Sequence, residues 1–136
     1  MAALTQDRNT ARRDGKELSL PVAAAKKIYA GSLVARDANG YATPGATATT
    51  LLGIGRAEEQ ADNTAGAGGA LSVKVAKGVF KFANTAGADL ITIADIGNDC
   101  YIVDDQTVTK TDGTGTRSIA GKVFDVDSDG VWVRFI

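Results

Sequence analysis

The last thirteen residues of the chain, FDVDSDGVWVRFI over 124–136, decide which fold the sequence predicts. They contain three alternate aspartates followed by a glycine: Asp125, Asp127, Asp129 and Gly130. This spacing matches the opening half of a calcium-binding loop. It is also typical of a tight turn between two strands, because Asp and Gly are favoured in the turns of β-hairpins.

The hairpin explains more of this segment than the calcium loop does. An EF-hand loop needs a bidentate carboxylate at its twelfth position and a helix on each side. Counted from Asp125, the twelfth residue is Ile136, and VWVRFI has the β-branched and aromatic alternation of a strand. We therefore predict a hairpin with a primed turn at Asp129-Gly130. The alternative is a looser calcium site whose ligands would be Asp125, Asp127 and Asp129.

The composition limits the partners of the protein. The 136 residues include 15 Lys and Arg and 16 Asp and Glu, so the net charge is −1. A nearly neutral chain has no general attraction to nucleic acid or to an anionic membrane. The sequence also lacks an apolar run long enough to cross a bilayer and the apolar core of a signal peptide. We expect a partner that is neither nucleic acid nor membrane.

The absence of histidine limits the chemistry. It removes Ser-His and Cys-His nucleophile pairs, the usual zinc sites and the commonest general base at neutral pH. The single cysteine, Cys100, cannot form an internal disulfide and is expected to be a small strand residue. We predict no cofactor.

Catalysis by carboxylates alone is the remaining enzymatic alternative. The acidic residues are dense in two places, which are Glu58-Glu59 with Asp62, and Asp104-Asp105. Adjacent residues on a strand point to opposite faces of a sheet, so these groups make poor acid/base pairs. We predict that the protein is not an enzyme and has no catalytic residues.

The chain divides into an arm and one domain. Residues 1–17 form the predicted arm, in which the segment before Leu18 has no apolar side chain larger than alanine after Leu4. Its arginines are Arg8, Arg12 and Arg13. The arm is either a flexible terminus or a segment that becomes ordered on a partner through charge pairs. Residues 18–136 form the predicted single β domain.

Short segments of period two, separated by Gly, Asn, Asp or Pro, follow the arm and predict strands. We expect an all-β domain, either a small β-barrel or a jelly-roll-like sandwich. Pro21 marks an edge strand because it cannot donate to a ladder. Hairpin turns are expected at two pairs, Asn39-Gly40 with positive φ at both positions, and Asp104-Asp105.

Three smaller features complete the expected domain. Residues 60–69, QADNTAGAGG, have no large side chain and predict a mobile surface loop. Thr92 and Asp95 form a capping box that predicts one short helical turn near 93–96, ended by Gly97. A solvated face is expected to carry Lys74, Lys77 and Lys81.

The final strand is apolar on both faces. Val131, Val133 and Phe135 share one face, and the opposite face carries Trp132 and Arg134. Such a strand is either buried between layers, with Trp132 in the core, or covered by a partner. Trp and Arg together are typical of interface hot spots. We keep both alternatives and name Trp132 and Arg134 as candidate interface residues.

Four segments in order, IYAGSLVARDANGYATP, GVFKFANTAGAD, ADIGNDCYIVDDQTV and GTRSIAGKVFDVDSDGVWV, resemble the capsid cement (decoration) proteins of tailed bacteriophages. The resemblance covers roughly residues 19–136 and rests on the succession of strands and turns. It implies a small barrel or jelly-roll-like protein, made in the host cytoplasm, that binds the outside of the assembled head. It also implies a homodimer or homotrimer that bridges neighbouring major capsid proteins.

A structural virion protein is thus the expected function. The candidate contact residues are Arg8, Arg12, Arg13, Trp132 and Arg134. The alternative is a calcium- or carbohydrate-binding β module. That alternative needs an aromatic platform, and the chain has only one Trp, three Tyr and four Phe.

Overall fold

The computed structural model describes residues 2–136, and it is all-β, with 44% of residues in strands and 4% in 3-10 turns. The strands are β1 (Glu17–Pro21), β2 (Lys26–Ile28), β3 (Leu33–Arg36), β4 (Ala42–Pro44), β5 (Leu52–Ala57), β6 (Ala61–Asn63), β7 (Ser72–Ala76), β8 (Gly78–Asn84), β9 (Asp99–Ile102), β10 (Thr107–Thr109), β11 (Ile119–Asp127) and β12 (Gly130–Phe135). The 3-10 turns are η1 (Gly87–Asp89) and η2 (Ile93–Asp95). The all-β prediction is confirmed.

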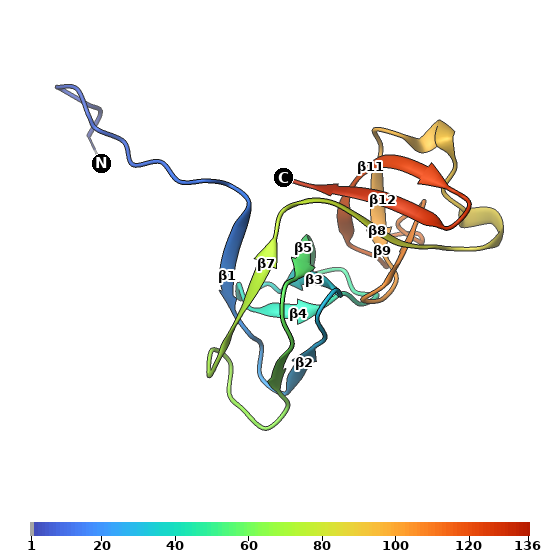
Figure 1. The fold of residues 1–136 in the computed structure, drawn as a ribbon, viewed down its shortest axis with the longest axis horizontal. Helices are drawn as coiled ribbons and strands as arrows, with labels where there is room; N and C mark the ends of the chain where they lie inside the picture. Colours follow the sequence, from blue (N-terminus) through green and yellow to red (C-terminus); the bar gives the residue numbers. More distant parts are fainter. Residues whose placement is uncertain (1) are drawn as a thin grey trace.

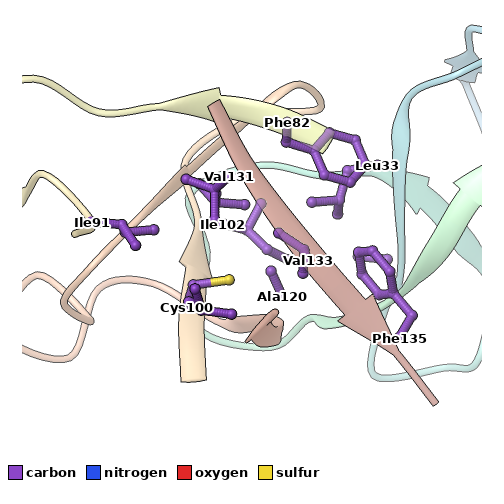
Figure 2. Close-up of a cluster of buried hydrophobic side chains, with 12 residues drawn as sticks. Leu33, Phe82, Ile91, Cys100, Ile102, Ala120, Val131, Val133 and Phe135 are labelled. Atoms are coloured by element: carbon purple, nitrogen blue, oxygen red, sulfur yellow. The ribbon is translucent and has the colours of Figure 1, made fainter. Parts of the chain in front are cut away.

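The C-terminal part of the chain forms a closed five-stranded barrel (Figure 1). The strand order is β10-β8-β12-β11-β9, and every pair is antiparallel except β10 with β8. Side chains from several strands fill the barrel in Figure 2, where Phe82 and Phe135 meet edge to face at 6.1 Å between ring centroids. Closure leaves no strand of this sheet unpaired on its long side.

The N-terminal part forms an open five-stranded sheet in the order β1-β7-β5-β3-β4, with a small β2-β6 ladder beside it. A parallel bridge between Val22 and Ala42 brings the two edge regions together at one end. The core of this sheet consists of small aliphatic residues: Val22, Ile28, Val34, Ala42, Ala57, Ala61, Val73 and Val75. β1 is an edge strand, as Pro21 predicts.

β3 joins the two cores. Leu33 and Ala35 belong to the barrel core, whereas Val34 between them belongs to the core of the open sheet. β5 lies next to β3 and also approaches the barrel. A Cβ atom at Gly53 would overlap the backbone of Ala120 on β11, so only glycine fits there.

The β3–β4 hairpin forms at Asn39-Gly40, but its turn differs from the prediction. Only Gly40 has a positive φ, of 86°, so the turn is not the primed type. Gly40 N instead donates to Asp37 O at 3.0 Å, and the Asp37 carboxylate accepts from Asn39 N at 2.9 Å and from Tyr41 N at 3.0 Å. The aspartate before the turn, which we did not single out, closes the loop.

The β11–β12 hairpin is confirmed, and its predicted turn is wrong by one residue. Asp127 pairs with Gly130, so the two loop residues are Ser128 and Asp129. Gly130 is the first residue of β12 and does not have a positive φ. Its Cβ would overlap the carbonyl oxygen of Phe82 on β8, so this glycine is required by close packing, not by the turn.

The predicted arm leads away from the body (Figure 1). Residues 2–16 form no strand and are exposed. β1 begins at Glu17, and just before it Lys16 O accepts a hydrogen bond from Lys77 N at 2.7 Å. The arm is therefore attached directly to the first edge strand of the open sheet.

Two expectations for the loops have different outcomes. The turn η2 begins with the predicted capping box, in which Thr92 N donates to the Asp95 carboxylate at 2.8 Å. The expected loop over 60–69 contains a strand instead, because β6 pairs with β2. Asn63 is buried, and its side-chain amide donates to Ala23 O at 3.0 Å and to Ala67 O at 2.9 Å. A buried amide thus anchors a segment that we expected to be mobile.

Candidate interaction surface

The outer face of the barrel strands β8, β12 and β11 carries the predicted interface residues of the domain. We call this surface the outer barrel face. Its side chains are Val79, Lys81, Lys122, Phe124, Asp125, Trp132 and Arg134. The register explains their grouping, because Trp132 is opposite Lys81 and Asp125, while Arg134 is opposite Val79 and Lys122.

A β-bulge adds a large aromatic side chain to this face. The β11–β12 register shifts between Val123 and Asp125, so Phe124 is the extra residue. Val123 is buried in the barrel, whereas Phe124 is 55% exposed and Asp125 is also exposed. Without the bulge, strict alternation would send Phe124 and Asp125 to opposite faces.

Trp132 lies half-buried on the outer barrel face, outside the buried core, so the core alternative is wrong for this residue. Its indole Nε1 donates to Asp127 Oδ2 at 3.0 Å. Lys81 Nζ lies 5.6 Å from the ring centroid, within the range of a cation–π contact. The two contacts orient a tryptophan that is partly exposed to solvent.

Asp127 connects these groups electrostatically. The Trp132 hydrogen bond, the Asp129 amide and the Lys81 ammonium hold the pKa of its carboxyl at about 2, well below the ordinary value. The hydrogen bond to Asp127 in turn raises the pKa of Lys81. Lys81 Nζ lies 3.1 Å from the Asp127 carboxylate and 3.6 Å from that of Asp129. Lys81 is exposed, as expected for a solvated face, and it also takes part in these two ion pairs.

The same contacts bear on the calcium alternative. Lys81 already places a positive charge between Asp127 and Asp129, and Asp125 accepts from the amide of Val126 at 2.8 Å. Protein donors use both oxygens of Asp127. Over residues 2–136, no group of three or more His, Cys, Asp or Glu side chains is placed to hold a metal ion. These contacts stabilise the β11–β12 hairpin.

A basic end adjoins the outer barrel face. A shallow hollow of about 300 Å³ is lined by Lys16, Lys77 and Arg134, together with Phe135 and Ile136. Partial burial lowers the pKa of Lys77. Within the described part of the chain, neither Lys77 nor Arg134 forms an ion pair. The arm begins at this end, near the C-terminus in Figure 1.

The arginines of the arm lie apart from Trp132 and Arg134. Arg8, Arg12 and Arg13 are exposed, and they form no ion pair with any residue of 2–136. The structure thus separates the five candidate residues into two groups, one on the arm and one on the barrel.

The other groups considered for chemistry have structural contacts. Glu58 pairs with Arg56 at 2.7 Å, and Glu59 accepts from the amide of Lys74 at 3.2 Å. Asp104 accepts from Gln106 N at 2.9 Å within the predicted turn. Burial raises the pKa of the Cys100 thiol to about 12, so this cysteine is protonated at neutral pH.

Three exposed apolar residues near η2 were missed by the sequence analysis: Leu90, Ile93 and Ile96. Ile93 is 72% exposed. The η2 segment lies beside β11, because Gly97 N donates to Val123 O at 2.8 Å. The pattern that could have predicted this exposed apolar group is a short segment with several isoleucines between turn residues.

Comparisons with known proteins add no relative. No protein-family model, no curated protein and no solved structure matches the chain. Within residues 2–136, no helix has the length and apolar character required to span a bilayer. The surface described above is therefore interpreted from its own residues.

Proposed function

We propose that this protein is a structural component of a tailed-phage virion that decorates the outside of the head by bridging neighbouring major capsid proteins. The observation that carries the proposal is an exposed cationic arm, attached to a β body whose last hairpin is stabilised by side-chain contacts. The sequence resemblance to cement proteins points in the same direction. Under this proposal the protein is made in the host cytoplasm and ends on the outer capsid surface.

The arm suits a contact with an acidic protein surface. Residues 2–16 carry four cationic side chains, which are Arg8, Arg12, Arg13 and Lys16, and two anionic ones, which are Asp7 and Asp14. At about 3.3 Å per residue, an extended segment of this length spans roughly 50 Å. We propose that this reach lets the arm contact a capsid subunit beyond the one under the body.

Two moderate contacts on one molecule are sufficient for a clamp. When the body holds one capsid subunit, the arm meets the next at a high effective concentration. The overall affinity then exceeds that of either contact alone. A braced β body and a long arm provide this arrangement without any catalytic group.

The test uses expanded heads that lack the protein. Purified wild-type protein is added to such heads, bound protein is measured by co-sedimentation, and head rupture is followed by calorimetry. We expect saturable binding and a higher rupture temperature. Absence of binding by the wild type would overturn the proposal.

Charge reversal on the arm tests its role. The triple variant Arg8→Glu, Arg12→Glu, Arg13→Glu is expected to bind heads at least tenfold more weakly, with a weaker dependence on salt. A matched control reverses three exposed cations elsewhere: Lys26→Glu, Lys74→Glu and Lys110→Glu. If the control loses as much affinity as the arm variant, net charge and not the arm explains binding.

A further inference from the structure

We propose that a small polar hollow beside Tyr29 binds a sugar ring. The hollow shares no residue with the outer barrel face or with the arm. The inference goes beyond the proposed structural role and does not depend on capsid binding, because it concerns a ligand of the isolated protein.

The hollow lies between two short segments, 29–32 and 105–106, and has a volume of about 340 Å³. This volume is at the small end of the range of small-molecule sites. The amide of Leu33 donates to Asp105 O at 2.8 Å, which holds the two segments together. The first segment is a turn in which Gly31 has a φ of 83°. Because the backbone fixes both walls, little ordering remains to be done when a ligand binds.

Three of the lining residues carry polar side chains that are available to a ligand: Ser32, Asp105 and Gln106. Ser32 is 7% exposed, and its hydroxyl oxygen has no hydrogen-bond partner among the described residues. Buried polar side chains nearly always have a partner, so this hydroxyl points to one outside the chain. Asp105 is half-buried and forms no ion pair with any residue of 2–136.

Tyr29 supplies the apolar surface at the same hollow. Its side chain lines the hollow and is 53% exposed. A sugar ring has C–H groups on its face and hydroxyl groups around its edge, so the face can pack on an aromatic ring while the edge binds polar groups. An exposed aromatic ring with a few convergent polar side chains fits such a ligand.

The charges near the hollow favour a neutral ligand over an ion. The Lys27 ammonium lies 5.0 Å from the centroid of the Tyr29 ring, and Asp105 lines the hollow with the opposite charge. A cation attracted by Asp105 is repelled by Lys27, and the reverse holds for an anion. Sugar hydroxyl groups are uncharged and both donate and accept, so they match the carboxylate, amide and hydroxyl groups of the lining residues.

The test titrates four probes into the ¹⁵N-labelled full chain: the methyl glycosides of glucose, galactose, mannose and N-acetylglucosamine. We expect at least one of them to shift the amide resonances of 29–32 and 105–106 in a saturable way. Tyr29→Ala and Asp105→Asn should each weaken this binding about tenfold or more, because each removes a direct contact. If none of the four glycosides shifts these amides, the proposal is overturned.

Matched controls make the same changes outside the hollow. Phe124→Ala removes an aromatic ring that is 55% exposed, close to the value for Tyr29, and Asp112→Asn neutralises an exposed aspartate. Both variants should bind the glycoside as the wild type does. A loss of affinity in Phe124→Ala equal to that in Tyr29→Ala would place the sugar elsewhere and overturn the proposal. Circular dichroism shows that each variant is folded.

Ser32→Ala separates ligand binding from a role in the fold. Because the hydroxyl has no partner within the described chain, its removal should leave the thermal midpoint unchanged or raise it. The same variant should bind the glycoside several-fold more weakly. Full affinity in Ser32→Ala would overturn the proposal. A saturable shift of the same amides by methylguanidinium, with none by the glycosides, would also overturn it, because the hollow would then be a cation site.

Discussion

Two hairpin turns of this protein share a sequence pattern and use it differently. Residues 37–40 are DANG and residues 127–130 are DSDG. In both turns the first aspartate accepts a hydrogen bond from the amide two residues later, at 2.9 Å in one case and 2.8 Å in the other. The glycines differ, because Gly40 has a φ of 86° and Gly130 does not have a positive φ.

The difference teaches that one glycine is required locally and the other by the fold. Gly40 supplies a left-handed backbone conformation, and a Cβ there would meet no atom within 4 Å. Gly130 lies where β12 passes the carbonyl oxygen of Phe82. The turn chemistry predicts that both hairpins exist, but only the assembled barrel reveals why the second needs glycine.

The largest expected effect comes from Gly130→Ala. The new methyl group overlaps the backbone oxygen of Phe82, which cannot move without disturbing the β8–β12 ladder. Overpacking of this kind costs about 3 kcal/mol. Gly40→Ala should cost about 1 kcal/mol, since only left-handed strain opposes it. Urea unfolding of both variants measures the difference.

Asparagine separates the two causes. Asn tolerates the left-handed conformation, so Gly40→Asn should recover part of the stability lost in Gly40→Ala. Gly130→Asn should be at least as destabilising as Gly130→Ala. Equal recovery at both positions would mean that the two glycines have the same role.

A smaller effect is expected from Asp37→Ala. The substitution removes the acceptor of the Asn39 and Tyr41 amides, and it should lower the free energy of unfolding by about 1 kcal/mol. Asp37→Asn keeps an acceptor oxygen and should lie closer to wild type. Thermal unfolding monitored by circular dichroism is sufficient. A larger loss in the Asn variant would contradict the hydrogen-bond explanation.

The smallest effect at neutral pH is expected from Asp127→Asn, because the Asp127–Lys81 pair is exposed and screened. The pKa of the Asp127 carboxyl lies at about 2 in the folded chain, below the ordinary value of 3.8. The contribution of the carboxylate is therefore fully present above about pH 4 and is lost as the pH falls toward 2.

Urea midpoints measured from pH 7 down to pH 2 check this dependence. The difference between wild type and Asp127→Asn should be constant above about pH 4 and disappear near pH 2. Asp37→Asn is the matched control, since Asp37 has no ion-pair partner among residues 2–136. A difference that grows on acidification would contradict the assignment.

Local chemistry made much of the fold predictable. Period-two segments predict the strands, Pro21 predicts an edge, and Thr92 with Asp95 predicts a helical turn. Features decided by distant contacts were not predictable. The buried amide of Asn63 acts through carbonyl groups in the 22–23 segment, and a single sequence does not show that β6 and β2 are paired.

The candidate surface, too, could be predicted only in part from the sequence. Trp132 and Arg134 could be named as candidate interface residues, because a strand with large apolar groups on both faces is expected to be buried on both sides, either by another layer or by a partner. Phe124 could not be predicted to share the outer barrel face with Asp125. Strict alternation places neighbouring residues on opposite faces, and the sequence does not reveal the β-bulge. That Asp125 and Arg134 form no ion pair with any residue of 2–136 is likewise visible only in the structure.

The attachment of the arm has a mechanical consequence. The arm continues directly into β1, and β1 is registered with β7 over five residue pairs, from Glu17 with Ala76 to Pro21 with Ser72. A force applied to the arm along the strand direction loads these pairs in shear, so they must yield together. Peeling from the other end would break them one after another. The direction of tension therefore determines how firmly the arm stays attached to the body.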